Sequence, residues 1–165
     1  MIDWFNNVID KPDTYVKIVL NNGFGNFRDG HNVFKNVSLR FNDQFSKFLE
    51  KKFPEYKVDL NFVRKSPFKQ EEPNYIHSDE MMGDLTAILY LNKNHPKDYG
   101  TSFYYPNGEF ETMYDADYNS VLVFNSDRLH SRNNFDNFGE GDDSRLIQVA
   151  FLKKRNNEEG RVGVF

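Results

Sequence analysis

The sequence contains no cysteine, only three alanines and no long apolar run. Without cysteine, a disulfide, a zinc–thiolate site, an iron–sulfur cluster and a thiol nucleophile are all excluded. The longest apolar run, residues 87–91, is far shorter than the roughly 20 residues that a membrane-spanning helix needs. Residues 1–20 also lack the basic and apolar segments of a secretory signal. We therefore expect a cytoplasmic protein that does not contact a membrane.

The apolar residues that are present are mostly bulky. Leu, Ile, Val and Phe account for 46 of the 165 residues, about 28% and above the roughly 20% needed to build a core. Bulky residues separated by polar ones favour half-buried strands over alanine-rich helices. The net charge of −4 argues against a nucleic-acid partner without excluding a local basic groove. Twenty asparagines beside three alanines are typical of an AT-rich coding genome, which suggests a bacteriophage origin and then a host-cell cytoplasm.

The length of the chain suits a single domain over residues 1–165. Within it, residues 1–56 predict helical support for a core that follows. One helix is expected to begin at Pro12 and to stop before Asn21, and a second is expected over about 42–53, where apolar residues recur three or four apart.

After Pro54 the apolar period changes to two, which predicts strands through a core over residues 57–155, followed by a tail at 156–165. Short strands behind a helical start favour an antiparallel β-sandwich with helices packed on one side, a mainly β (α+β) fold. The predicted strands lie at about residues 58–63, 74–79, 85–92, 101–105, 119–124, 129–134 and 145–153.

Histidines are the candidate metal ligands, and the chain has four. His77 and Asp79 lie two apart in a predicted strand, so their side chains project to the same face. With His130, which follows a distant apolar strand, they would form the triad of two histidines and one carboxylate that holds non-haem Fe(II) and leaves positions open. A hydrogen-bonded surface histidine is the alternative for His77. His31 and His95 follow loop signals and are interpreted as surface residues.

Two further residues, Tyr90 and Arg145, complete an ordered set with the three candidate metal ligands along the chain. Tyr90 lies on a predicted strand, and Arg145 opens the last strong strand after His130. In this order, residues 74–153 resemble the Fe(II)/2-oxoglutarate-dependent dioxygenases, and within them the small prolyl-4-hydroxylase-like branch. The resemblance implies a double-stranded β-helix, or jelly roll, in which His77, Asp79 and His130 bind Fe(II). The segments that carry it are Tyr75-Ile76-His77-Ser78-Asp79, Thr86-Ala87-Ile88-Leu89-Tyr90-Leu91-Asn92 and Gly100-Thr101-Ser102-Phe103.

The resemblance also implies a site for the co-substrate 2-oxoglutarate. It places Arg145 in a salt bridge with the distal carboxylate of 2-oxoglutarate and Tyr90 in a hydrogen bond to the same group. Arginine is physically suited to that role, because its planar fork binds a carboxylate bidentately without titrating. Thr86, Ile88 and Tyr90 share one face of a predicted strand and would form a mostly apolar wall beside the co-substrate.

Arg132 competes with Arg145 for the distal carboxylate. Arg145 lies further beyond His130 than the arginine of that family usually does, so residues 135–144 are interpreted as an enlarged hairpin loop, where insertions are tolerated. Arg145 is preferred because it opens the better strand. Arg132, which shares a strand face with His130, would then contact the substrate or the inner carboxylate of 2-oxoglutarate. Tyr75 would line the substrate pocket or serve as a core aromatic residue.

The resemblance implies an enzyme that hydroxylates its substrate with O2 while 2-oxoglutarate is decarboxylated to succinate and CO2, with ascorbate as an optional reductant. The expected substrate is a prolyl residue in a peptide or protein, although analogy of fold does not determine a substrate. Two alternatives stay open. One is an oxygenase of the same fold that acts on a nucleobase or a free small molecule, and the other is a non-catalytic jelly-roll binding module.

Overall fold

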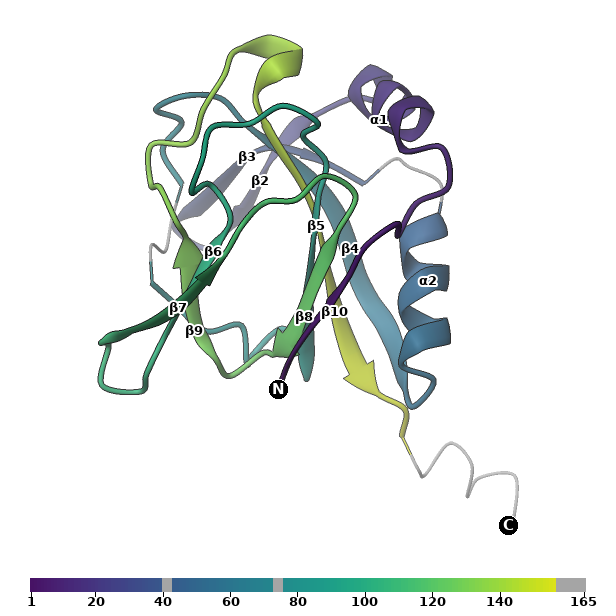
Figure 1. The fold of residues 1–165 in the computed structure, drawn as a ribbon, viewed down its shortest axis with the longest axis vertical. Coiled ribbons are helices and arrows are strands. Elements are labelled where there is room, and N and C mark those ends of the chain that lie inside the picture. The colour runs from purple at the N-terminus through teal and green to yellow at the C-terminus, as the bar shows by residue number, and fades with distance from the viewer. Residues whose placement is uncertain (40–42, 73–75, 157–165) are drawn as a thin grey trace.

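The computed structural model describes residues 1–39, 43–72 and 76–156. Within these ranges the strands form two facing antiparallel sheets, one of seven strands and one of three (Figure 1). The large sheet comprises, in spatial order, β1 (Ile2–Phe5), β8 (Val121–Asn125), β5 (Leu85–Tyr90), β10 (Arg145–Lys154), β4 (Tyr56–Ser66), β3 (Asn32–Ser38) and β2 (Gly25–Asp29). The small sheet comprises β7 (Phe110–Tyr114), β6 (Thr101–Tyr104) and β9 (Leu129–Arg132).

Alternation of side chains divides the large sheet into two apolar faces. On one face, Val63 and Leu89 pack with side chains of the helices α1 (Pro12–Asn21) and α2 (Gln44–Lys52), which cover that side of the sheet in Figure 1. On the other face, side chains of β5, β8 and β10 pack against Phe103 of the small sheet. The region between the two sheets is therefore separate from the helical layer, and it holds the site described below.

Both helices follow from their local sequence. Pro12 occupies the first turn of α1, where its missing N–H leaves no hydrogen bond unmade. In α2 the buried Phe45 and Leu49 lie four apart and pack on the sheet. Lys51 and Lys52 stand in the last turn of α2, where positive charge complements the helix dipole. The two predicted helices are thus observed, the second slightly shorter than its predicted range.

The expectation of a mainly β fold with helices packed on one side is confirmed, but two expectations about secondary structure need correction. Residues 1–56 are not helical support alone, because β1, β2 and β3 also come from this segment and extend the large sheet at both of its edges. Their partners β8 and β4 are distant in sequence, so local patterns could not reveal the pairing. Of the strand expected at 74–79, residues 74 and 75 lie outside the described residues, and within 76–79 only an isolated bridge at His77 is observed.

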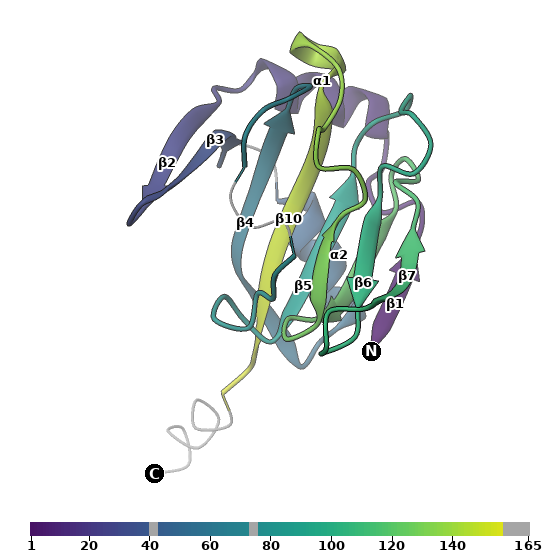
Figure 2. The ribbon, with the colours of Figure 1, turned by 90° about the vertical axis from the view of Figure 1, so that its left-hand side faces the viewer.

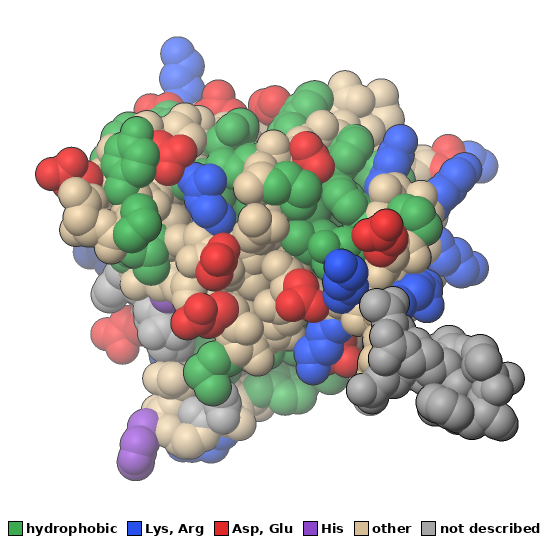
Figure 3. Space-filling model, turned by 90° about the horizontal axis from the view of Figure 1, so that it is seen from below, with side chains coloured by type: hydrophobic (Ala, Val, Ile, Leu, Met, Phe, Trp, Pro, Cys, Tyr) green, Lys and Arg blue, Asp and Glu red, His purple; other side chains and the backbone are tan. Residues whose placement is uncertain are grey.

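The outer surface of the molecule has two features that bear on function. Figure 2 shows the β2–β3 hairpin at the outer edge of the large sheet, splayed away from the rest of the fold. On the face drawn in Figure 3, most basic side chains lie on the right and most acidic ones at the left and centre, with apolar side chains between them. Among the described residues, no helix combines the length and apolar character needed to cross a bilayer. Of the predicted tail at 156–165, the described ranges include only Asn156.

Candidate metal centre

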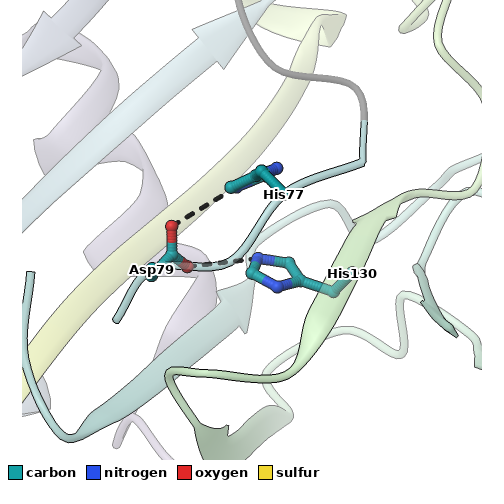
Figure 4. A group of neighbouring side chains, drawn as sticks. All are labelled: His77, Asp79 and His130. Atoms are coloured by element: carbon teal, nitrogen blue, oxygen red, sulfur yellow. Dashed lines mark ion pairs between the residues drawn. The ribbon is translucent and has the colours of Figure 1, made fainter. Parts of the chain in front are cut away.

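The three side chains predicted to bind a metal, those of His77, Asp79 and His130, come together between the two sheets (Figure 4). Their backbone is held by hydrogen bonds. His77 and His130 exchange two N–H···O bonds, of 3.0 and 2.9 Å, across their isolated bridge. The N–H of Asp79 donates to the carbonyl of Ser126 at 2.7 Å. The segment that carries His77 and Asp79 is therefore tied to β9 and to the turn before it, although it is not a full strand.

The three side chains converge at distances that suit one metal ion. Nε2 of His77 lies 3.3 Å from Oδ1 of Asp79, and Nε2 of His130 lies 3.1 Å from Oδ2 of Asp79, as the dashed lines in Figure 4 show. One ligand atom from each residue falls within 4.8 Å of the other two. Metal–ligand bonds of about 2.0–2.2 Å place adjacent ligands of an octahedral ion about 3 Å apart. The two nitrogens and one oxygen thus fit a first-row metal, including Fe(II).

Neighbouring groups orient two of these ligands. Nδ1 of His130 lies 3.0 Å from the carbonyl oxygen of Arg128, and this contact orients the ring so that Nε2 faces Asp79 and the position of a metal. Oγ1 of Thr86 donates to Oδ2 of Asp79 at 3.3 Å and lies 2.9 Å from Oγ of Ser126. Such outer contacts hold ligand side chains in place before metal binds.

The exposure of the three ligands differs and indicates where the site opens. The side chain of His130 is only 5% exposed, whereas that of His77 is 30% exposed. Burial by itself would raise the pKa of Asp79, but hydrogen bonds from His130 and His77 outweigh it and hold that pKa well below its usual range. Asp79 is therefore ionised near neutral pH, as a carboxylate ligand must be.

A pocket of about 460 Å³ opens beside the cluster on the inner face of the large sheet. It contains the predicted wall residues Thr86 and Ile88 of β5. Half of its remaining apolar lining comes from alternate residues of β4 and β10, which point to the same side because the two strands are paired in register. Those lining residues are Leu60, Phe62, Ile147, Val149 and Phe151.

The predicted co-substrate residues Arg145 and Tyr90 stand next to this pocket. Arg145 opens β10, lines the pocket and is only 5% exposed. Tyr90 is buried, and its hydroxyl is hydrogen-bonded to Oγ1 of Thr101, which also lines the pocket. Burial raises the pKa of Tyr90 to about 12, so the phenol stays neutral and able to donate a hydrogen bond.

Arg132, the competing arginine, also lines the pocket but is already engaged by protein groups. Its Nη2 and Nε donate to the carbonyl of Phe135 at 3.1 and 3.3 Å, and its Nη1 lies 3.4 Å from Oε1 of Glu72. The structure therefore brings both arginines to one pocket and gives them different surroundings. Tyr75 lies outside the described residues.

Two charged pocket residues were missed by sequence reasoning, Arg64 and Glu72. Oε1 of Glu72 lies 3.7 Å from Nη1 of Arg64, and the hydroxyl of Ser66 donates a hydrogen bond to Oε2 of Glu72. Burial would raise the pKa of Glu72, but the charge of Arg64 and the hydrogen bond from Ser66 keep it below its usual value. The signal that could have identified Arg64 is the period of two, since Arg64 follows Leu60 and Phe62 on the face of β4 that lines the pocket.

Comparisons with known proteins were made for the sequence and for the fold. No protein-family model and no curated protein matches the sequence. A prolyl hydroxylase from Trichoplax adhaerens, solved in complex with a hypoxia inducible factor peptide fragment, is similar in structure with a TM-score of 0.61 and 16% identity, over 98% of this chain and 86% of that chain.

Two further solved structures support the same likeness. An oxidoreductase of the 2OG-Fe(II) oxygenase family from Burkholderia pseudomallei gives a TM-score of 0.58 at 14% identity, over 94% of this chain and 88% of that chain. The epimerase SnoN from nogalamycin biosynthesis, solved with Fe3+, alpha ketoglutarate and nogalamycin RO, gives 0.57 at 11% identity, over 92% and 78%. The chain therefore has the jelly-roll fold of the 2-oxoglutarate–Fe(II) oxygenases.

Proposed function

We propose that this protein is an Fe(II)- and 2-oxoglutarate-dependent oxygenase that hydroxylates its substrate, with release of succinate and CO2. The observation that carries the proposal is that one pocket contains both the cluster of His77, Asp79 and His130 and the buried Arg145. The three metal ligands alone would be compatible with many kinds of metalloprotein. A buried guanidinium in the same pocket adds a partner for the distal carboxylate of 2-oxoglutarate.

Each residue has a physical role in this proposal. His77, Asp79 and His130 would hold the iron, which together with 2-oxoglutarate supplies the oxidation of the substrate by O2. Arg145 would bind the distal carboxylate, and the Tyr90 hydroxyl would donate a hydrogen bond to it. The apolar side chains of β4, β5 and β10 exclude water from the reacting groups, which strengthens the electrostatic contacts inside the pocket.

For the substrate, we propose a prolyl residue in a peptide or protein. The likeness to the Trichoplax adhaerens prolyl hydroxylase, which was solved with a peptide, supports this choice at the level of fold. The active unit would be a single oxygenase domain over residues 1–165, since strands from both halves of the chain line the pocket. An oxygenase acting on a nucleobase or free small molecule, and a non-catalytic binding module, are the outcomes that would replace this proposal.

The test is iron-dependent release of succinate from 2-oxoglutarate by purified protein, measured with and without pools of peptides, nucleic acids and small molecules. Turnover should require Fe(II) and should disappear in His77→Ala. His95→Ala is the matched control, because His95 is a partly exposed loop histidine outside the pocket, and its Nδ1 contacts the carbonyl of Pro96. Succinate formation at the wild-type rate in His77→Ala would refute the proposal. Absence of iron-dependent 2-oxoglutarate binding to the wild-type protein would indicate a non-catalytic binding module.

A further inference from the structure

The charges in the pocket do not balance. Arg64, Arg132 and Arg145 contribute three positive charges, and Glu72 and Asp79 contribute two negative ones, so these five residues leave one positive charge in excess. Fe(II) carries two positive charges and the two carboxylates of 2-oxoglutarate carry two negative ones. Binding of both groups would therefore leave the excess positive charge of the pocket unchanged. Because an uncompensated charge is unfavourable in a largely apolar pocket, a further anionic group is expected there.

Arg64 is our candidate to bind this anionic group, because two of its hydrogen-bond donors lack an acceptor among the described residues. Its Nη1 lies 3.7 Å from Glu72, which is longer than a hydrogen bond. Its Nε and Nη2 are buried, and no residue in the described ranges accepts a hydrogen bond from them. Glu72 is meanwhile engaged by Ser66 and by Nε2 of Gln70 at 3.0 Å. Two donors of a planar fork therefore lack the acceptors that arginine normally finds when buried.

The surroundings of Arg64 are apolar and aromatic. The ring of Phe34, on the β2–β3 hairpin, lies 5.2 Å from the guanidinium carbon. Phe27 of the same hairpin and Leu60 and Phe62 of β4 also line the pocket. A ligand that reaches Arg64 would therefore pack an apolar part against these side chains while its charged group meets the guanidinium.

We propose that the substrate carries a carboxylate or phosphate group that is bound by Arg64, next to an apolar part that packs on Phe34 and Phe62. This inference rests on the proposed function, because that function assigns Arg145 to 2-oxoglutarate and leaves Arg64 for the substrate. The anionic group could belong to a free organic acid or to an acidic residue beside a proline in a peptide. Both sources offer the same chemistry to the arginine fork.

The test is calorimetric binding of matched probes to the full chain loaded with Mn2+ and 2-oxoglutarate, a combination that binds ligands without turnover. One pair is 3-phenylpropanoate and its primary amide, and the other is the blocked peptide acetyl-Ala-Pro-Glu-amide and its Gln counterpart. In at least one pair, the anionic member should bind about tenfold more tightly than the neutral member, and the pair that shows the preference identifies the source. An added charged hydrogen bond commonly accounts for a difference of that size.

Substitutions then assign the preference to Arg64. Arg64→Gln should reduce the tenfold preference to less than about twofold while the affinity for 2-oxoglutarate stays within about threefold, and Arg64→Lys should restore part of the preference. Arg28→Gln is the matched control, because Arg28 is an exposed arginine of β2 that does not line the pocket. Thermal melting of each variant checks that it is folded.

Three results would overturn the inference: no preference for the anion in either pair, a preference unchanged in Arg64→Gln, or competition between the anionic probe and 2-oxoglutarate. Failure of the proposed function is a different result, namely no metal-dependent binding of 2-oxoglutarate to the wild-type protein. In that case the comparison of wild type with Arg64→Gln still reports whether the pocket binds an anion at Arg64.

Discussion

Oγ1 of Thr86 lies 3.3 Å from Oδ2 of Asp79, the same carboxylate oxygen that contacts Nε2 of His130. Thr86 thus orients a ligand without being one. Thr86→Val keeps the shape of the side chain and removes the hydroxyl, so we expect the affinity for Fe(II) to fall by about tenfold, in line with other outer-shell substitutions at metal sites. Metal titration under anaerobic conditions measures this affinity. Wild-type affinity in a folded Thr86→Val protein would contradict the orienting role.

Arg145 and Arg132 should differ in their effect on 2-oxoglutarate. Arg145→Gln removes the buried guanidinium, and we expect the Kd for 2-oxoglutarate to rise by roughly 100-fold, since losing one member of a buried charge pair costs roughly 2–5 kcal/mol. Arg132→Gln should change this Kd much less, because Arg132 is already engaged by Glu72 and by the carbonyl of Phe135. Calorimetry on the Mn2+-loaded variants measures the Kd for 2-oxoglutarate and shows which arginine binds its distal carboxylate. A larger effect at Arg132 would reverse the assignment.

Gly100 is required by the close approach of β6 to β7. A Cβ at this position would lie 1.7 Å from the carbonyl oxygen of Tyr114, so backbone would have to move. We expect Gly100→Ala to lower the free energy of unfolding by about 3 kcal/mol, the upper part of the range for overpacking. Urea denaturation measures the change. Gly23→Ala is the control, because nothing lies within 4 Å of its added Cβ, and it should stay within about 0.5 kcal/mol of wild type.

The lowered pKa of Glu72 predicts a pH-dependent contribution to stability. The carboxyl group has a lower pKa in the folded than in the unfolded state, so it stabilises the fold above the unfolded value of 4.5 and loses this effect as pH falls through the folded pKa. Glu72→Gln should therefore be less stable than wild type near neutral pH, by about 3 kcal/mol for a broken buried ion pair.

That difference in stability should shrink as the pH is lowered below 4.5. Urea denaturation at a series of pH values measures it, and Glu109→Gln, at an exposed position, is the control. A stability difference between wild type and Glu72→Gln that does not change with pH would show that the charge of Glu72 is not what stabilises the pocket.

Local sequence patterns were sufficient for the helices, for most strands of the core and for the shared face of His77 and Asp79. Phe45 and Leu49 recur four apart and predicted α2, and the alternating residues of β4 and β5 predicted strands. Only for β5 did the sequence also predict a face toward the co-substrate, through Thr86 and Ile88. These features depend on residues that are close in sequence, so they can be recognised without knowledge of the fold. The pairing of His77 and Asp79 with His130 needed the family resemblance as well, because no local pattern links residues that distant.

The residue types and their periods therefore determined the class of fold, and together with the family resemblance they determined the candidate metal ligands. Only the tertiary structure placed β1, β2 and β3 in the large sheet and brought Arg64 and Glu72 beside the metal cluster. The reason is physical. Which strands pair, and which charged side chains share a pocket, depends on the segments that meet in the fold, and these are distant in sequence. The period of apolar residues indicates only the face of a strand on which a side chain lies. Arg64 continues the period of two set by Leu60 and Phe62, but only the fold shows that its Nε and Nη2 lack hydrogen-bond acceptors among the described residues.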